Sequence, residues 1–294
     1  MTVDSSIASG AAPEADPSAL GVRVRAFFAY RLLNRDARQR LIMGVIGIVG
    51  FILLWYLLTE YWKVPRFEKL PGPVEVWSEF ISEDPTYGTS IFTPQYYQHI
   101  LWSTLRILAA FGIATALGVP LGLFMGWKKI VKDYAFPIVE LLRPIPVMAW
   151  VPLAILMFMS REAPIIFLAG LASFFATVLN TLLGVESIEE SYFRAARCLG
   201  ASSRHVFTKV VVPGALPFVF TGLQISMGVA WFSLVAAEML SGEYGLGYLI
   251  WDSYVLSQYP VIVIGMITLG VIGYVCSALI RMVGNKLMRW TTRG

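Results

Sequence analysis

The sequence predicts an all-α polytopic membrane protein with six transmembrane helices and both termini in the cytoplasm. Of its 294 residues, 57% are hydrophobic and 14% are charged, whereas soluble domains carry about 25% charged residues. Apolar runs recur along the chain, and about 20 such residues are enough for a helix to cross the hydrocarbon core. Lysine and arginine gather in alternate connecting segments, which fixes the orientation.

The N-terminal region precedes a transmembrane domain that we expect over residues 41–288. Residues 1–20 are rich in Ala, Ser and Pro and predict a disordered tail. Residues 21–40 contain six arginines and predict a basic cytoplasmic segment. The uncharged run at 41–58 predicts the first span, and two tryptophans and two tyrosines between positions 55 and 62 mark its external end.

An external loop over residues 63–98, with one surface helix at 74–81, leads to a second span at 100–127. Three glycines follow one another at every fourth position of that span: Gly118, Gly122 and Gly126. A stripe of residues without side chains allows another helix to approach closely. Arg106 lies only two turns inside the span, and we expect its side chain to reach back to the external interface.

The third span, residues 134–158, is predicted to be broken. It contains four prolines, which lack an amide donor and obstruct a regular helix: Pro137, Pro144, Pro146 and Pro152. Carbonyl groups freed in this way are tolerated at membrane depth only beneath protein or beside a water-filled cavity. Glu140 and Arg143 are close enough to pair on one helical face. They either line a transport pathway or form a salt bridge that allows a kinked helix to pack.

A polar stretch from Glu189 to Pro217 separates a fourth span at 163–184 from a fifth at 214–237. A sixth span is expected at 260–284. The segments predicted to be internal hold six arginines before the first span, three lysines after the second, four basic residues in the polar stretch and four at the C-terminus. The external segments hold only four, so the polar stretch is predicted to be cytoplasmic.

Glu238 stands at the external end of the fifth span. Because charged groups at membrane depth usually face a bundle interior or a cavity, this carboxylate is expected to contact a solute, to gate the pathway, or to hydrogen-bond a neighbouring helix.

Several function classes lack support in the sequence. The two cysteines and two histidines cannot supply a zinc site, and no basic stripe with interleaved aromatic residues suggests nucleic-acid binding. The dipeptide Gly-Lys does not occur, so the phosphate-binding loop of many ATPases is missing. Two other function classes are conceivable for a polytopic membrane protein. A secondary transporter or channel that is not powered by ATP would be expected to contain inverted repeats. A membrane-embedded enzyme would need catalytic residues, and suitable ones are scarce.

The polar stretch resembles the cytoplasmic signature of binding-protein-dependent ABC importer permeases. In that signature Glu-Ala-Ala is followed by three residues and Gly, then by nine residues, Ile, one residue and Leu-Pro. Here Ala195 and Ala196 precede Gly200 by three residues, and nine more lead to Val210 and the closing pair Val212-Pro213. The sequence departs from the pattern at its first position, where Arg194 replaces Glu.

The resemblance covers about residues 65–285. Segments such as LLRPIPVMAWVPLAIL and GVAWFSLVAAEML are similar to the nitrate, sulfonate, bicarbonate and taurine branch of these permeases. The phrases AAEMLSG and LIWDSY are most similar to its nitrate and bicarbonate members.

This resemblance implies a type I ABC importer permease fold and a non-catalytic, multi-pass subunit of a bacterial inner membrane that moves a small anion into the cell. It also implies a second, identical permease subunit, an external solute-binding protein, and two ATPase subunits that carry ATP and Mg²⁺. No metal, cofactor or catalytic residue is expected in this chain.

The resemblance places the contact with the ATPase in a coupling loop over residues 185–213. Gly200 would allow a sharp turn, and Ser202 or Ser203 would cap the helix that follows. The residues expected to take part are Ala195, Ala196, Gly200, Ala201, Ser202, Arg204, His205, Phe207, Val210 and Pro213. The residues expected along the translocation pathway are Glu140, Arg143, Pro146, Trp231 and Glu238.

Overall fold

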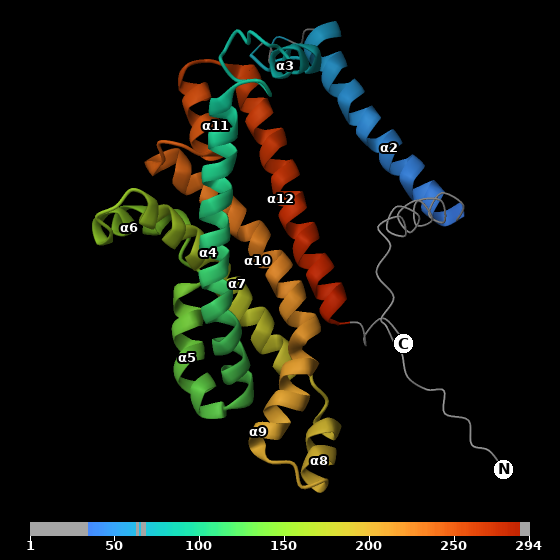
Figure 1. Cartoon of the computed structure of the whole chain (residues 1–294), viewed down its shortest axis with the longest axis vertical. Coiled ribbons are helices and arrows are strands. Elements are labelled where there is room, and N and C mark those ends of the chain that lie inside the picture. The colour runs from blue at the N-terminus through green and yellow to red at the C-terminus, as the bar shows by residue number, and fades with distance from the viewer. Residues whose placement is uncertain (1–34, 63–64, 66–68, 289–294) are drawn as a thin grey trace, which may run out of the picture. The chain divides into compact units, whose positions relative to one another are not determined.

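The computed structural model describes residues 35–62, 65 and 69–288, and the regular elements in these ranges are all helices (Figure 1). The chain divides into two compact units, residues 1–68 and 69–294. The predicted tail at 1–20 and residues 21–34 of the predicted basic segment lie outside the described residues.

In the first unit, α2 (Arg35–Tyr56) continues into a π-helical turn, η1 (Leu57–Tyr61). Residues 38–61 together are long and apolar enough to cross a membrane. The described apolar side chains of α2 are exposed, among them Phe51 and Leu53, except for Trp55, which is partly covered. This helix confirms the span predicted at 41–58.

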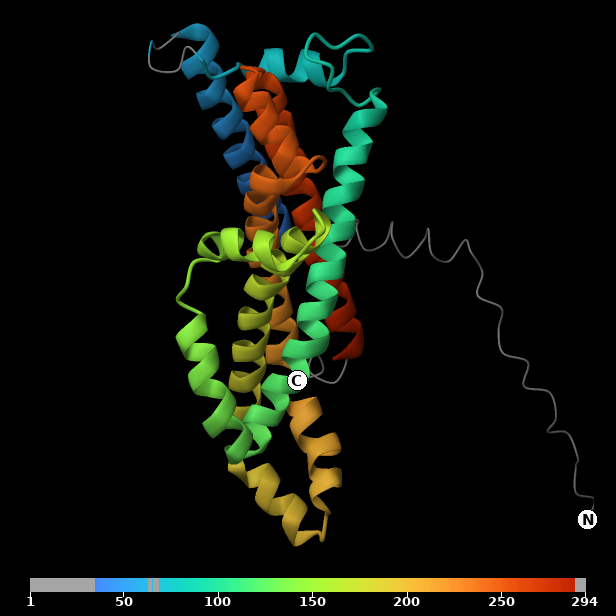
Figure 2. The ribbon, with the colours of Figure 1, turned by 90° about the vertical axis from the view of Figure 1, so that its left-hand side faces the viewer.

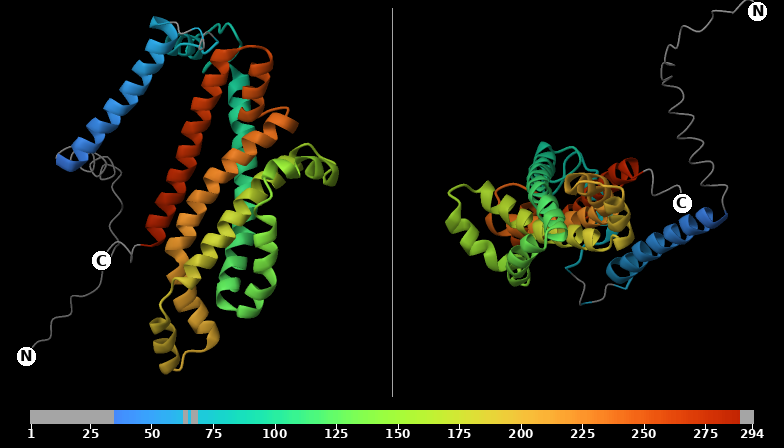
Figure 3. Two further views of the ribbon diagram at one scale, coloured as in Figure 1. Left: turned by 180° about the vertical axis from the view of Figure 1, so that it is seen from behind. Right: turned by 90° about the horizontal axis from the view of Figure 1, so that it is seen from below.

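The second unit is organised around α7 (Glu162–Glu186), which packs along α4 (Pro94–Trp127) and along α10 (Val212–Ser241). A buried hydroxyl contact joins α7 to α10, with 2.5 Å between the Oγ atoms of Ser173 and Ser226. The views from two sides show these three long helices side by side (Figure 2, Figure 3).

The glycine stripe on α4 faces α7, as predicted. A Cβ atom added at Gly118 would lie 3.1 Å from the Cβ of Thr177, and one added at Gly122 would lie 2.6 Å from the Cβ of Thr181. At Gly126 the distance to the Cβ of Val185 would be 2.5 Å. Only residues without a side chain permit this contact, so the stripe serves helix packing.

The predicted third span is two helical segments at a right angle. α5 (Lys129–Leu142) is followed by a turn, and then by the 3₁₀ helix η3 (Val147–Trp150) and α6 (Val151–Met157), with a bend of 90°. Figure 2 shows α6 running across the direction of α4 and α7. The bend falls at Pro144 and Pro146, as their missing amide donors predict, whereas Pro137 lies inside α5 and Pro152 in the first turn of α6 without breaking either helix.

The opposite ends of the unit carry different elements (Figure 1, Figure 3). The end predicted to be external holds α3 (Pro73–Phe80), where a surface helix is predicted, and α11 (Leu246–Val255). α12 (Tyr259–Leu287) begins there and corresponds to the predicted sixth span. The other end holds α8 (Glu190–Cys198) and α9 (Ser203–Val206).

Within the described ranges, five helical stretches are long and apolar enough to cross a membrane, or six if the bent pair counts as one span. The six-helix prediction therefore agrees with the structure. The predicted bounds differ most at the fifth stretch, which begins at Ser203 and not at residue 214, because the second half of the predicted polar loop is helical and continuous with α10. The helices of the second and third spans also begin earlier than predicted, at Pro94 and Lys129.

Candidate functional site

α8 and α9 form a hairpin over residues 190–206, which the charge distribution predicts to be cytoplasmic, and α8 ends in a Schellman turn. The Ala201 N–H donates to the Ala196 carbonyl and the Gly200 N–H donates to the Arg197 carbonyl, each over 3.0 Å. This pair of bonds requires a left-handed residue just after the helix, and Gly200 has a φ of +74°. The predicted sharp turn at Gly200 is confirmed.

Ser202 starts the second arm of the hairpin. Its Oγ accepts a hydrogen bond from the His205 N–H over 3.3 Å, so of the two serines that the sequence suggests, Ser202 is the N-cap and Ser203 is the first residue of α9. α9 then passes through a π-helical turn, η4 (Phe207–Val211), directly into α10. Pro213 explains this turn, because its ring crowds the carbonyl four residues earlier and it has no N–H to bond that group.

Both arms of the hairpin contact the cytoplasmic end of α4 through aromatic rings. The ring centroid of Trp127 lies 6.2 Å from that of Phe193 on α8 and 6.0 Å from that of Phe207 on η4. Phe207 also stacks on Phe124 with a centroid separation of 5.5 Å. The hairpin is therefore attached to α4 and α10 at the same time.

The outer surface of the hairpin is basic and has an apolar tip. Leu199 is 87% exposed, and the basic side chains of both arms are exposed: Arg194, Arg197, Arg204, His205 and Lys209. Ala195 is also exposed, while Ala196, Ala201, Phe207, Val210 and Pro213 are partly covered. Arg194, which stands where the signature has Glu, forms no ion pair with the described residues.

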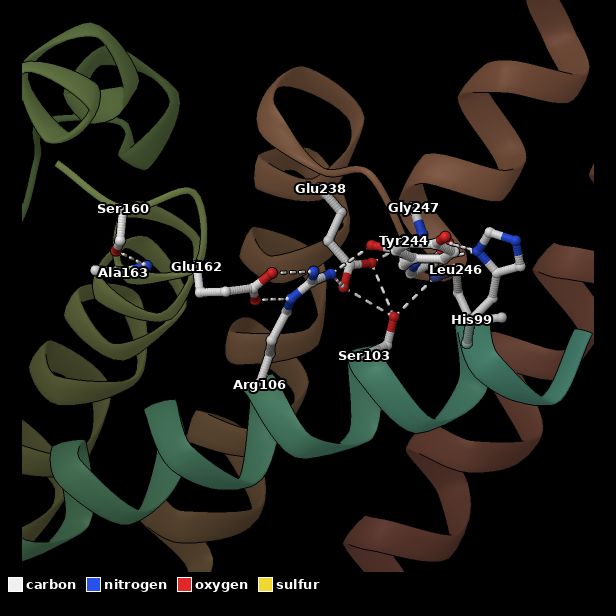
Figure 4. A network of polar contacts seen from close by, with 11 residues as sticks. His99, Ser103, Arg106, Ser160, Glu162, Ala163, Glu238, Tyr244, Leu246 and Gly247 are labelled. Atoms are coloured by element: carbon white, nitrogen blue, oxygen red, sulfur yellow. Dashed lines mark hydrogen bonds and ion pairs between the residues drawn. The ribbon is translucent and has the colours of Figure 1, made fainter. Parts of the chain in front are cut away.

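An ionic network lies toward the external end of the second unit (Figure 4). Arg106 is 2% exposed and donates through Nη1 to a carboxylate oxygen of Glu238 over 2.8 Å. Its Nε and Nη2 atoms donate to the two carboxylate oxygens of Glu162 over 2.5 and 2.8 Å. The expectation that Arg106 reaches back to the interface is wrong, because its buried side chain pairs with the buried Glu238 and with Glu162, whose side chain is 44% exposed.

The same network fastens the connection between α10 and α11. Glu238, which is fully buried, accepts hydrogen bonds from the Ser103 Oγ and the Gly247 N–H, each over 2.9 Å. Gly245 has a φ of +127°, and a Cβ atom there would lie 2.4 Å from the Glu238 carboxylate. Arg161 and Glu243 form a further ion pair at the surface of this connection.

The predicted pathway residues occupy three different environments. Glu140 and Arg143 form an ion pair of 3.1 Å beside the α5–η3 bend, and both side chains are substantially exposed. Pro146 is exposed and precedes the first residue of η3. Trp231 is 5% exposed within the core between α4, α6, α7, α10 and α12, and Glu238 belongs to the ionic network. Glu140, Arg143 and Pro146 thus lie at the α5–η3 bend, and Val147, which follows Pro146, packs against the core that contains Trp231.

The roles of Ser103 and Glu162 in this network were not predicted from the sequence. A weak signal existed for Glu162, which precedes an uncharged run and must find a partner or water at its start. The sequence gives no such signal for Ser103, because the hydroxyl group of a serine in a transmembrane helix usually hydrogen-bonds to the backbone of its own helix.

Comparisons with known proteins agree with this architecture. The family profile described as "Binding-protein-dependent transport system inner membrane component" matches residues 118–292. A protein of Brucella abortus (strain 2308), named as an ABC transporter permease, is 35% identical over 253 residues, which are 86% of this chain and 95% of the relative.

Two relatives from Synechocystis sp. have names that specify a substrate. The bicarbonate transport system permease protein CmpB is 31% identical over 81% of this chain and 86% of its own length. The nitrate import permease protein NrtB is 30% identical over 80% of this chain and 84% of its own length.

A solved structure of the methionine ABC transporter MetNI in an inward-facing conformation is similar in fold. It matches with a TM-score of 0.53 at 21% identity, over 67% of this chain and 96% of its own. With the six-span topology and the hairpin, these matches give one conclusion: the chain belongs to the family of binding-protein-dependent transport system inner membrane components, and it is the non-catalytic, multi-pass permease subunit of an ABC importer of the inner membrane.

Proposed function

We propose that this permease imports a small anion of the nitrate and bicarbonate class, with sulfonates and taurine as the wider range. The support is the similarity to a bicarbonate permease and a nitrate permease over four fifths of the chain. The imported solute reaches the permease from an external binding protein, and a second copy of this chain completes the pathway. ATP and Mg²⁺ are bound by separate ATPase subunits.

The hairpin α8–α9 is the proposed contact with the ATPase. This assignment is supported mainly by the conformation of the signature residues. They form a Schellman turn with Gly200 at its tip, and the Leu199 side chain projects into solvent. The hairpin continues into α10 without a break in the helix and touches α4. A displacement of the ATPase would therefore be passed to two transmembrane helices, as a rigid-body change between two states requires.

The function is tested by reconstitution. The tagged chain is purified from its native membranes together with its ATPase, placed in proteoliposomes, and supplied with the binding protein and labelled nitrate or bicarbonate. We expect uptake that requires ATP hydrolysis and stops with a non-hydrolysable analogue. Uptake that continues without ATP and follows an ion gradient would instead support a secondary transporter.

The docking contact is tested separately with Leu199→Ser. Because this side chain is 87% exposed, its loss does not affect the core, and we expect weaker retention of the ATPase with normal membrane insertion. Leu256→Ser is the matched control, because Leu256 is 58% exposed just after α11 at the other end of the unit. Equal retention of the ATPase by both variants and the unaltered chain would contradict docking at the hairpin tip.

A further inference from the structure

The bend between α5 and η3 lies within the thickness of the membrane. Lys129, at the start of α5, belongs to a lysine-rich segment that marks the cytoplasmic interface. At about 1.5 Å per residue, Glu140 lies roughly 16 Å and Arg143 roughly 21 Å farther along the helix. The hydrocarbon core is about 30 Å thick. We call residues 140–146 the elbow, and it stands near the middle of that core.

Within the elbow, the backbone of residues 143–146 is non-helical and uncovered. Residues Arg143, Pro144, Ile145 and Pro146 are all exposed in the single chain. Non-helical backbone at membrane depth is stable only where it is covered by protein or lines a water-filled cavity. The elbow therefore cannot face lipid.

The side chains of α5 divide into two faces. Tyr134, Ile138 and Leu141 are between 59% and 77% exposed and form an apolar stripe with helical spacing, which suits contact with lipid. Glu140 and Arg143 form a separate stripe with a different direction. Their side chains are 41% and 52% exposed, and a charged group in hydrocarbon is costly. The charged stripe therefore faces water or protein, and the apolar stripe faces the acyl chains.

The guanidinium of Arg143 has donors to spare. Its one described ion pair uses a single atom, Nη1, whereas a guanidinium carries five N–H donors. The next helical segment begins at Val147, and its first backbone bond runs from the Ala149 N–H to the Pro146 carbonyl. The N–H groups of Val147 and Met148 precede that bond and have no partner within the helix.

We propose that the elbow lines the water-filled part of the translocation pathway, and that Arg143 contacts the passing anion as a planar, fork-shaped donor for an oxyanion. Glu140 is its counter-ion when the site is empty, which keeps the empty pathway close to neutral. This inference deepens the proposed function and rests on it for the identity of the anion. It adds the residue that meets the solute in the membrane.

The first test measures access to water. In the complex with its ATPase and in a chain carrying Cys198→Ser and Cys276→Ser, Ile145→Cys is treated with a methanethiosulfonate reagent that bears a sulfonate group. We expect reaction in at least one nucleotide state and slower reaction in excess nitrate. Ile138→Cys, on the apolar stripe, is the matched control and should stay unlabelled.

Two results of this test would overturn the inference. Absence of labelling at Ile145→Cys, with and without ATP, would mean that protein covers the elbow. Efficient disulfide formation between two copies of Ile145→Cys, without reaction of the reagent, would mean that the elbow is a contact between subunits.

The second test measures uptake with saturating, loaded binding protein. Arg143→Ala should lower the uptake rate by about tenfold or more, as expected for the loss of a charge-assisted contact, and Arg143→Lys should restore part of it. Lys132→Ala is the matched control, because Lys132 lies on the same helix and pairs with Glu186 at the cytoplasmic interface. We expect it to leave the rate within about twofold, because exposed ion pairs contribute little to stability.

Uptake by the unaltered chain and uptake by Arg143→Ala distinguish failure of the proposed function from failure of the role of Arg143. If the unaltered chain shows no ATP-dependent anion uptake, the proposed function fails. If it does show that uptake and Arg143→Ala takes up the anion equally fast, the function stands and the role of Arg143 is wrong.

Discussion

The Ala201 N–H bonds the Ala196 carbonyl across a turn whose left-handed residue is Gly200. In the signature, three residues separate Ala from Gly. A Schellman turn has the same spacing between the residue whose carbonyl accepts the bond and the left-handed residue. A side chain at Gly200 would meet nothing within 4 Å, so the constraint on this position is conformational and not steric.

Gly200→Ala should therefore weaken coupling without unfolding the chain. The left-handed conformation costs most residues about 1–2 kcal/mol, and asparagine less, so Gly200→Asn should retain more activity than Gly200→Ala. ATP-dependent uptake and ATPase retention are the measurements. Gly88→Ala is the matched control, because Gly88 also has a φ of +74° and no neighbour within 4 Å, but lies in the external loop. Equal loss of uptake in both alanine variants would contradict a role specific to the hairpin.

Trp127→Ala should loosen the hairpin from α4. The substitution removes the ring contacts with Phe193 and Phe207, each worth about 0.5–1.5 kcal/mol beyond its buried area. We expect faster amide hydrogen exchange over residues 190–206, and more ATP hydrolysed for each solute imported. Trp127→Phe, which keeps an aromatic ring, should restore most of the protection. Unchanged exchange in Trp127→Ala would show that the rings do not fasten the hairpin.

Sequence patterns located the transmembrane helices and the hairpin because these depend on local properties. Hydropathy and the distribution of lysine and arginine report which segments prefer lipid or cytoplasm. The glycine stripe on α4 indicated a close helix contact, and α7 provides it, with Gly122 against Thr181. Ser202 and Gly200 were identifiable because capping and turn formation depend on the residue itself.

The remaining features depend on residues distant in sequence. Arg106 and Glu238 are 132 positions apart, and no local pattern indicates that they meet. The fifth span was predicted to start at residue 214, because the charges of α9 resemble those of a loop. The prolines predicted a break in the third span but not the 90° angle between its two segments. Proline determines where a helix ends, whereas it does not determine the direction of the next segment.

Gly122→Ala should destabilise the contact between α4 and α7. The added methyl group would lie 2.6 Å from both the Thr181 Cβ and the Val178 carbonyl oxygen, so the helices must move apart. Overpacking of this kind costs about 1–3 kcal/mol. Thermal unfolding in detergent measures the loss. Gly112→Ala on the same helix is the control, because a Cβ there meets nothing within 4 Å, and its Tm should not fall. A Tm for Gly122→Ala equal to that of the control would mean that the helices accommodate the methyl group.

Glu238→Ala should be among the most destabilising single changes at the external end. It leaves Arg106, the Ser103 Oγ and the Gly247 N–H without their shared acceptor inside the protein. Removing one partner of a buried ion pair costs about 3–5 kcal/mol. Glu238→Gln keeps one acceptor oxygen and should lose less, although its amide group would face the donors of Arg106 and Gly247.

The ion pair of Arg161 with Glu243 provides the control for Glu238→Ala. Both of its side chains are at least 60% exposed, so Arg161→Ala should change stability by only about 0–1 kcal/mol. Thermal unfolding of the three variants, measured in the same detergent, should order them with Glu238→Ala lowest, Glu238→Gln next and Arg161→Ala close to the unaltered chain. If Glu238→Ala unfolds at the temperature of Arg161→Ala, water replaces the carboxylate without loss. Glu238 would then stand in a hydrated site, where contact with a solute becomes the better explanation of its charge.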